Sequence, residues 1–385
     1  MRPTFDSEVI VTTVLIVDDS SFVRKTLAAI LKQASDIRVV GTASNGEEAL
    51  KLIHTLDPDV VTLDVEMPGM DGLTTLSRIM KDAPRPVLMI SSLTQEGADT
   101  TLKALEMGAL DFLPKFSGGG VQEIASLTHD LSAKIKALGR RKTFVRLLHR
   151  HNRLNSGPAP CVKPATIAAP KSKETAPTTA SDPPTRLTMP TGRRQFDAIG
   201  IGVSTGGPPA VTTILSALPE DFPSPILIAQ HMPESFTGPF AKRLDTKCAI
   251  RVKEAEHGEP LLSGWAYIAP GGKHLRLSKT RAGLLTASIS EEPKTELYKP
   301  SANELMESMG QILGRRALGI TLTGMGSDGL QGTRVLKQAG GYAIAQSEDS
   351  CVVYGMPKVV VEAGLANIVA DLDGMAKIII TQMIK

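Results

Sequence analysis

The chain has 385 residues, too many for one ordinary hydrophobic core, and this length predicts two or three domains. Its formal net charge is only +3, so no overall basic field indicates a protein that binds nucleic acid. The cysteines lie far apart, without the spacing of a metal site or a redox pair, and are expected to be free thiols in a reducing cytoplasm: Cys161, Cys248 and Cys351.

The first apolar run covers residues 9–17 and is hydrophobic enough to suggest a signal peptide. Acidic residues precede it, however, and the pair Asp18 and Asp19 ends it, so we expect a buried strand instead. No stretch of the chain approaches the eighteen or so apolar residues that a membrane span needs. The sequence therefore predicts a soluble, cytoplasmic protein without membrane insertion.

Short apolar runs alternate with helical patterns over residues 1–139, which is typical of a parallel sheet with crossover helices. The pattern predicts a five-unit βα domain. The candidate strands are 14–17, 39–42, 60–63, 87–90 and 109–113, and apolar positions at helical spacing occupy 22–31, 47–56, 73–80 and 98–107.

Polar residues with metal and phosphate chemistry stand at the carboxyl ends of these predicted strands: Asp18, Asp19, Asp64, Ser91 and Lys115. In an open α/β sheet such ends converge on one crevice. Three carboxylates repel one another unless a cation lies among them, and oxygen-only ligands suit Mg²⁺. With the metal bound, Asp64 can accept a phosphoryl group, which Lys115 and the Ser91 hydroxyl can then ligate. Each Asp could instead cap the helix that follows it. This alternative would require chance alone to place five polar residues at matching strand ends, which is rare.

Residues 10–139 resemble the receiver domain of response regulators. The motifs VLIVDDS and LDVEMPGMDG, together with the late lysine, carry the resemblance. It implies a flavodoxin-like (βα)5 fold, with Asp64 as the phosphorylation site and Phe112 as an aromatic switch residue. In one respect the chain departs from the family pattern: proline usually follows the lysine, whereas Lys115 stands between Pro114 and Phe116.

Residues 140–194 are predicted to form a linker. The net positive charge lies here, because residues 140–195 carry twelve Lys and Arg residues against two acidic ones, a balance of +10, whereas the rest of the chain carries −7. Residues 156–190 contain eight prolines among Ala, Thr and Ser, and such a segment cannot bury enough apolar surface to offset its ordering entropy. The preceding stretch, 140–153, has the pattern of a basic amphipathic helix, expected to be solvated or docked on its own domain.

The alternating pattern resumes at Phe196 and predicts a second α/β domain over residues 195–385, Rossmann-like and doubly wound. Residues 264–288, with Gly271 and Gly272 at a turn, have the pattern of a hairpin rather than a crossover. The candidate strands are 198–203, 226–229, 265–268, 318–322 and 342–345.

Residues 199–207 have the sequence IGIGVSTGG, an apolar run that ends in a serine and two glycines before a helix-like stretch. Ser204 is therefore expected on a strand-to-helix turn, where the following amides point at whatever it attacks, and it is a candidate nucleophile. The glycines could instead only allow close packing of the strand and the helix, or they could cradle a dinucleotide phosphate. The dinucleotide alternative needs an acidic residue at the end of the second strand, but Glu220 and Asp221 precede this strand.

A nucleophilic serine needs a base and an orienting acid at neighbouring strand ends. His231 directly follows the second strand, and Asp328 lies in the Gly-rich sequence LTGMGSDG after residues 318–322. His257 and His274 fit this role less well, because one lies in a charged loop and the other in the predicted hairpin. We therefore expect Ser204, His231 and Asp328 to act together, without a cofactor for hydrolysis.

From residue 196 to its end the chain resembles the catalytic domain of CheB, the family of chemotaxis protein-glutamate methylesterases. The motifs GxSTGG, AQHMP and TGMGxDG match, as does the order of receiver, linker and effector. The resemblance implies hydrolysis of glutamyl methyl esters, and deamidation of glutamines, on the cytoplasmic helices of chemoreceptors, with a chemotaxis histidine kinase as phosphodonor. It also implies that amides at Thr205 and near Met325 form the oxyanion hole.

Two other classes of protein are possible from the sequence. A transcription factor would carry a basic helix-turn-helix, whereas residues 196–385 show little basic clustering. A scaffold would not need Ser204, His231 and Asp328 together. A proline-rich linker does not transmit strain between the two domains. If the chain is the enzyme, we therefore expect the unphosphorylated receiver to cover the Ser204 crevice with the face that carries Phe112.

Overall fold

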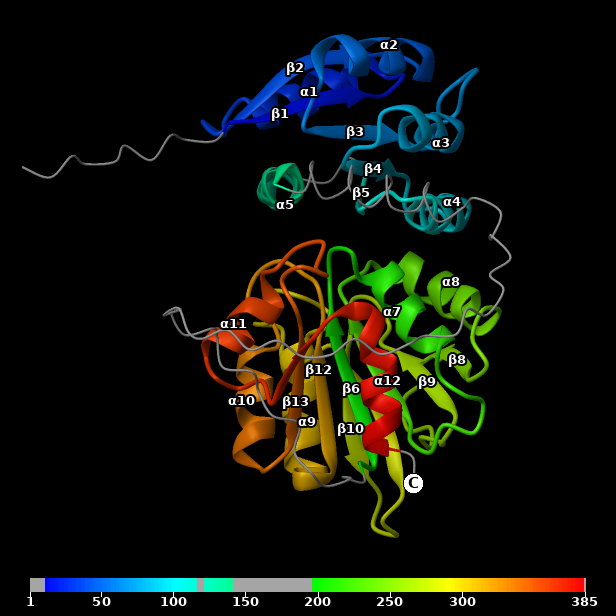
Figure 1. Ribbon diagram of the computed structural model, residues 1–385, viewed down its shortest axis with the longest axis vertical. Coiled ribbons are helices and arrows are strands. Elements are labelled where there is room, and N and C mark those ends of the chain that lie inside the picture. Colours follow the sequence, from blue (N-terminus) through cyan, green and yellow to red (C-terminus); the bar gives the residue numbers. More distant parts are fainter. Residues whose placement is uncertain (1–10, 116–120, 141–195, 384–385) are drawn as a thin grey trace, which may run out of the picture.

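The computed structural model describes residues 11–115, 121–140 and 196–383, which form two α/β units (Figure 1). The predicted linker, with its basic stretch 140–153, lies outside the described residues except for Arg140. Phe116 and Cys161 lie outside them as well. Cys248 and Cys351 are free thiols, as expected.

The first unit is a five-stranded parallel sheet in the order β2-β1-β3-β4-β5, which confirms the predicted flavodoxin-like (βα)5 fold. Strands β3 and β4 are fully buried, as expected of parallel strands that helices cover on both faces. Helices α1 to α4 each follow a polar N-cap whose side chain accepts a hydrogen bond from the first turn. The elements are β1 (Thr12–Val17), α1 (Ser21–Leu31), β2 (Ile37–Ala43), α2 (Gly46–Leu56), β3 (Val60–Asp64), α3 (Gly72–Asp82), β4 (Val87–Ser91), α4 (Gln95–Glu106), β5 (Asp111–Pro114) and α5 (Val121–Gly139).

The second unit is built on a seven-stranded sheet in the order β14-β13-β12-β6-β7-β9-β8, in which every neighbouring pair is parallel. Its elements are β6 (Ala198–Val203), α7 (Gly207–Ser216), β7 (Ile226–Gln230), α8 (Glu234–Asp245), β8 (Arg251–Glu254), β9 (Trp265–Ile268), β10 (His274–Lys279), β11 (Leu285–Ser290), α9 (Ala302–Leu313), η1 (Gly314–Arg316), β12 (Ala317–Thr321), α10 (Leu330–Gln338), β13 (Tyr342–Gln346), α11 (Met356–Glu362), β14 (Ile368–Ala370) and α12 (Leu372–Met383).

The predicted hairpin over residues 264–288 is wrong in its first half. Strand β9 is nearly all buried and pairs in parallel with β7 and β8, while the antiparallel hairpin consists of β10 and β11. Gly271 does not form the hairpin turn. It lies against the start of α8, where a Cβ atom would come within 2.3 Å of the Glu234 backbone nitrogen. Close packing requires a glycine here, and from the sequence alone this glycine cannot be told from a turn glycine.

In the second sheet, β6 is the strand at which the order of strand addition changes sides. From β6 it continues to β7 on one side, and later it returns to β12 on the other. In doubly wound sheets the crevice at such a switch point, at the carboxyl ends of the strands, is where ligands bind. The segments after β6, β7 and β12 therefore share one crevice, and these are the segments that contain the predicted catalytic residues.

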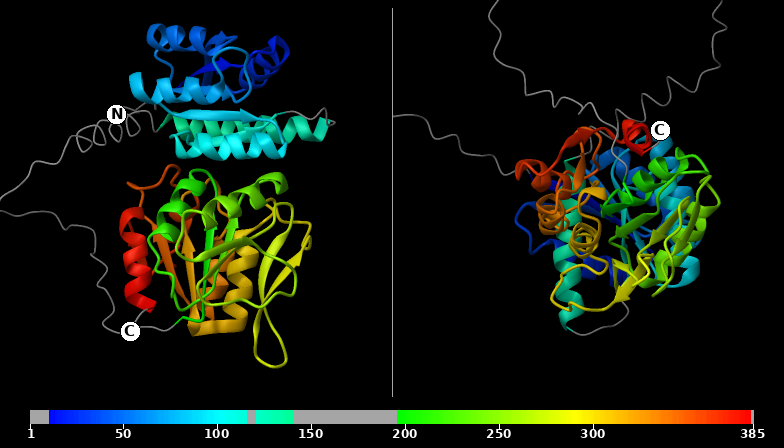
Figure 2. Two further views of the ribbon diagram at one scale, coloured as in Figure 1. Left: turned by 90° about the vertical axis from the view of Figure 1, so that its right-hand side faces the viewer. Right: turned by 90° about the horizontal axis from the view of Figure 1, so that it is seen from below.

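The first unit packs against the second through α4, β5 and α5 (Figures 1 and 2). Phe112 of β5 stacks on Phe236 of α8, with ring centroids 4.4 Å apart. Glu106, the last residue of α4, forms ion pairs with Arg243 and Lys247. The Phe112 face of the first unit thus covers the carboxyl ends of the second sheet, as the sequence led us to expect.

Candidate functional site

Ser204 lies on the turn between β6 and α7. Its amide donates a hydrogen bond to the Thr323 carbonyl oxygen over 3.0 Å, and its own carbonyl oxygen accepts one from the Gly207 amide over 2.8 Å. Between them Gly206 has φ of +76°, the left-handed region that glycine tolerates best. The STGG sequence therefore forms the sharp strand-to-helix turn that the sequence predicts.

His231 follows β7 directly, and its amide donates to the Val203 carbonyl oxygen over 3.0 Å, which ties it to the strand that precedes Ser204. Its side chain is only 8% exposed, and Nε2 lies 2.7 Å from Oδ2 of Asp328. The other ring nitrogen, Nδ1, is buried and has no hydrogen-bond partner among the described residues.

Asp328 is held by the first turn of α9. Oδ1 accepts from the Ser301 hydroxyl and from the Asn303 amide, and Oδ2 accepts from the Ala302 amide over 2.6 Å. Burial alone would raise the pKa of Asp328, but the hydrogen bond from His231 and these amides lower it below its ordinary value. An ionised carboxylate only accepts, so Nε2 of His231 donates to Asp328, and in a neutral imidazole, which carries a single ring proton, Nδ1 is then the acceptor.

Ser204 and His231 line one cavity of about 270 Å³ with Thr205 and Met325. Four of the five residues predicted for catalysis and its support therefore meet in one space. Asp328 lies behind His231 rather than in this cavity. Residues of the first unit close the other side: Asp111, Phe112, Leu113, Pro114, Asp130 and Lys134.

A polar cluster joins the two units next to Ser204. The Thr205 hydroxyl donates to Oδ2 of Asp111 over 2.6 Å, and Lys134 of α5 pairs with the same carboxylate. Both Thr205 and Asp111 are buried. Thr205, the residue next to the candidate nucleophile, is thus hydrogen-bonded to the first unit.

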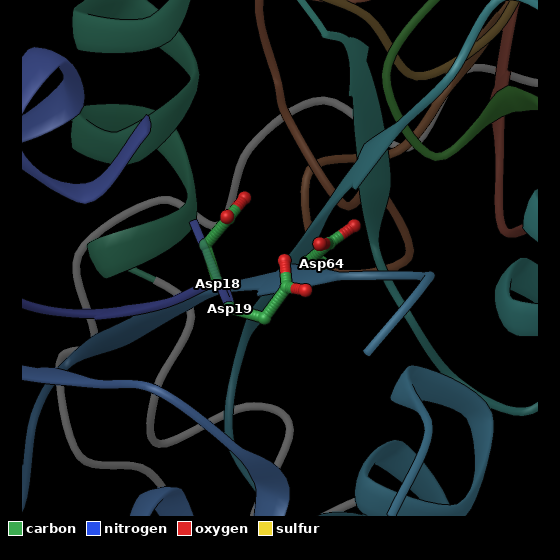
Figure 3. A group of neighbouring side chains, drawn as sticks. All are labelled: Asp18, Asp19 and Asp64. Carbon is green, nitrogen blue, oxygen red and sulfur yellow. The ribbon is translucent and has the colours of Figure 1, made fainter. Parts of the chain in front are cut away.

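The acidic residues of the first unit gather at the ends of β1 and β3 (Figure 3). Asp18, Asp19 and Asp64 each offer a carboxylate oxygen, and these oxygens all lie within 4.8 Å of one another. Oδ2 of Asp18 is buried without a hydrogen-bond partner in the part of the chain that the structure describes. A buried carboxylate oxygen that accepts no hydrogen bond and lies beside two others fits a divalent cation with oxygen ligands, and Mg²⁺ is such a cation.

Lys115 reaches this acidic group, with Nζ 2.7 Å from Oδ2 of Asp64 and 3.9 Å from Oδ2 of Asp18. Burial raises the pKa of Asp64 to about 6, although Lys115 opposes the shift. The Ser91 hydroxyl is fully buried and hydrogen-bonds the first turns of α4, with Thr101 Oγ1 at 2.6 Å and the Gly97 carbonyl oxygen at 3.2 Å. Ser91 therefore links the acidic end of the sheet to the helix that packs on the second unit.

Several residues of the site were not predicted. Gln230 clamps the turn, since its side-chain amide donates to the carbonyl oxygens of Ser204 and His231. Ser301 caps α9, and the sequence pattern Ser-x-x-Glu at Ser301 and Glu304 before an apolar helical stretch could have revealed it. Tyr298 stacks on His231, and no sequence signal indicated this contact.

Comparison with known proteins assigns both units. Residues 14–121 match the family model of the response regulator receiver domain, and residues 199–379 match that of CheB methylesterase. The protein-glutamate methylesterase/protein-glutamine glutaminase 1 of Oleidesulfovibrio alaskensis is 56% identical over 97% of this chain and 99% of its own length. The protein-glutamate methylesterase/protein-glutamine glutaminase of Pyrococcus horikoshii is 41% identical over 95% of this chain and 92% of its own.

Among solved structures, the catalytic domain of Thermotoga maritima CheB methylesterase is 38% identical, covers 48% of this chain and 98% of its own, and has a TM-score of 0.47. The response regulator domain of Thermotoga maritima CheB is 43% identical, covers 34% and 97% of the two chains, and has a TM-score of 0.31. None of the helices described over residues 11–115, 121–140 and 196–383 has both the length and the apolar character to cross a membrane.

Proposed function

Because the chain belongs to the CheB methylesterase family, with a receiver domain at residues 14–121, we propose that it is a phosphorylation-activated hydrolase of glutamyl methyl esters on chemoreceptors. The same site deamidates receptor glutamines, as the names of its relatives indicate for those proteins. The cytoplasmic helices of the receptors are the substrate, so the enzyme acts in the cytoplasm during chemotactic adaptation.

The observation that carries this proposal is the His231–Asp328 pair, with the free Nδ1 of His231 buried beside the cavity that Ser204 lines. Ser204 Oγ attacks the ester carbonyl carbon while Nδ1 takes the hydroxyl proton, and Asp328 stabilises the imidazolium that forms. The tetrahedral intermediate then expels methoxide, which receives the proton from Nδ1 and leaves as methanol. Water hydrolyses the acyl-enzyme by the same route, and with a glutamine substrate the leaving group is ammonia.

The oxyanion of the intermediate needs hydrogen-bond donors that are fixed in advance. The amides of Thr205 and Met325 are the candidates, because both residues line the cavity with Ser204. One such donor contributes about 3 kcal/mol to transition-state stabilisation. Since the Thr205 side chain is bonded to Asp111 of the receiver, the position of the receiver bears directly on this part of the site.

The receiver takes up phosphate at Asp64, with a histidine kinase as donor. Asp18, Asp19 and Asp64 are the residues that would hold Mg²⁺, which when bound neutralises charge on the incoming phosphoryl group. The Asp64 carboxylate forms the new P–O bond as the bond to the donor breaks. Lys115, which pairs with Asp64, then stabilises the acyl phosphate.

Replacing Asp64 by asparagine should abolish stimulation by acetyl phosphate and Mg²⁺, because the amide cannot form the acyl phosphate. Basal hydrolysis should persist, since Asp64 lies outside the Ser204 cavity. The measurement is methanol release from methylated receptor membranes, with and without phosphodonor. Stimulation that survives in Asp64→Asn would mean that another residue is phosphorylated.

In the unphosphorylated chain the receiver obstructs the site, and its release should activate the enzyme. Glu106→Gln removes the ion pairs to Arg243 and Lys247 and should raise basal methanol release about two- to fivefold, the effect of a surface ion pair. Hydrogen bonds from Arg243 hold the pKa of Glu106 at about 2, below its ordinary value of 4.5. The ion pairs therefore stabilise the closed form fully above about pH 4.5 and are lost only as the pH falls toward 2.

The gain from Glu106→Gln should accordingly be the same at every pH between 6 and 8. Glu362→Gln is the matched control, because it removes the ion pair to Lys358 within α11 of the second unit. A basal rate that stays at the wild-type value in Glu106→Gln would contradict closure through α4 and α8.

A further inference from the structure

Tyr298 covers the candidate base. Its ring lies nearly parallel to the imidazole of His231, with centroids 4.2 Å apart and planes inclined by 12°. It comes from the segment between β11 and α9, which is tied down by a hydrogen bond from the Gly272 amide to the Lys299 carbonyl oxygen over 3.1 Å. The tyrosine is half-buried and lines the cavity with Ser204.

The same segment continues into the groups that hold Asp328. Three residues after Tyr298, the Ser301 hydroxyl donates to Oδ1 of Asp328 over 2.8 Å, and the Ala302 amide donates to Oδ2. One short stretch of chain therefore contacts both the face of the imidazole and the carboxylate at its edge. Displacement of this stretch would disturb both members of the pair at once.

A single hydrogen bond does not orient an imidazole ring. The contact between Nε2 and Asp328 fixes one atom, but the ring plane can still turn about the Cβ–Cγ bond, a soft torsion in which Nε2 moves little. A planar group stacked on one face removes this freedom, because parallel rings in contact resist tilting. The lone pair of Nδ1 lies in the ring plane, so the plane decides where that lone pair points.

We propose that Tyr298 is a positioning residue that holds the plane of His231 so that Nδ1 receives the Ser204 proton. The proposal rests on the esterase function proposed above. Only the ring makes the contact, so phenylalanine should replace tyrosine here, whereas an aliphatic side chain should not. Tyr298 acts through His231 and forms no bond to the reacting atoms.

The kinetic test uses the full chain, stimulated with acetyl phosphate and Mg²⁺, and methylated receptor membranes as substrate. Tyr298→Ala should lower kcat about 10- to 100-fold and leave KM within about threefold of wild type, because misplacing a base costs turnover rather than binding. Tyr298→Phe should recover most of kcat. Tyr298→Leu, which keeps apolar bulk without a planar ring, should resemble Tyr298→Ala and serves as the second variant if alanine unfolds the loop.

A second readout does not depend on activity. In the full chain labelled with ¹⁵N-histidine, the wild-type signal of His231 should show a proton on Nε2 and none on Nδ1, with Tyr298→Phe unchanged. Tyr298→Ala and Tyr298→Leu should broaden this signal or shift it toward the average of the two tautomers. His231→Gln assigns the signal, and Ser204→Ala should keep the wild-type signal although it loses hydrolysis.

Three results would overturn the proposal. A rise in KM with unchanged kcat in Tyr298→Ala would show that Tyr298 contacts the substrate. Equal losses of kcat in Tyr298→Phe and Tyr298→Ala would assign the effect to the tyrosine hydroxyl. A change confined to the ratio of stimulated to basal rate would place Tyr298 in receiver closure, since Asp130 of the receiver lines the same cavity. Activity that survives in Ser204→Ala would instead refute the proposed esterase mechanism while leaving the tautomer measurement valid.

Discussion

Replacement of Ser204 by alanine is expected to lower methanol release by about 10⁵- to 10⁶-fold, because the atom that forms the acyl-enzyme bond is removed. His231→Ala should cost about as much, since the Ser204 hydroxyl then has no proton acceptor. The residual rate should come from the oxyanion donors and from substrate binding. Initial rates with methylated receptor membranes measure these losses, and thermal unfolding shows whether each variant remains folded.

The double variant Ser204→Ala, His231→Ala provides the control for this interpretation. Residues that act as a unit lose their shared contribution with the first substitution, so the double variant should be no slower than the slower single variant. A double variant that is slower by a further factor of about a hundred would mean that the two side chains act independently, and the shared mechanism would be wrong.

Asp328→Asn is expected to lower kcat by about 10⁴-fold through the wrong histidine tautomer. If the asparagine oxygen accepts from Ser301 and Asn303, its NH₂ group must face the Ala302 amide and His231 Nε2, which are both donors at present. His231 can then bond the new side chain only by accepting at Nε2. Its proton moves to Nδ1, where it faces Ser204 and prevents the ring from acting as a base.

The same ¹⁵N-histidine spectrum checks this expectation, because the His231 signal in Asp328→Asn should show the proton on Nδ1. The variant should also unfold more easily, since the Ala302 amide loses its acceptor at the start of α9, at a cost of about 1–3 kcal/mol. A variant that keeps the wild-type tautomer yet loses activity would show that Asp328 contributes through charge alone.

Much of this site could be predicted from sequence because its residues are attached to strand ends. Asp18, Asp64, Ser204 and His231 each follow a short apolar run, and such runs mark buried parallel strands whatever lies around them. The Gly-rich turn after Val203 is local as well. The position of a side chain that directly follows a strand is determined by a few adjacent residues, so a short piece of sequence is enough to predict it.

Contacts between distant segments left no such signal. Thr205 and Asp111 are 94 positions apart, and Tyr298 reaches His231 from a loop without periodicity. The edge strands β8 and β14 were also missed: β8 carries polar residues on both sides of Val252, and β14 has only three residues. The pattern likewise gave no hint that His231 would bond Asp328 through Nε2, because this depends on the side-chain rotamer of His231 and on a residue 97 positions away.

Methanol release from methylated receptor membranes, measured on the full chain with and without acetyl phosphate and Mg²⁺, decides whether the chain is a serine esterase that phosphorylation activates. We predict slow release without phosphodonor, at least tenfold faster release with it, and no release above background in Ser204→Ala. A tenfold activation requires a shift of only about 1.4 kcal/mol toward the open form. Equal release by wild type and Ser204→Ala, or none from wild type under either condition, would refute this function.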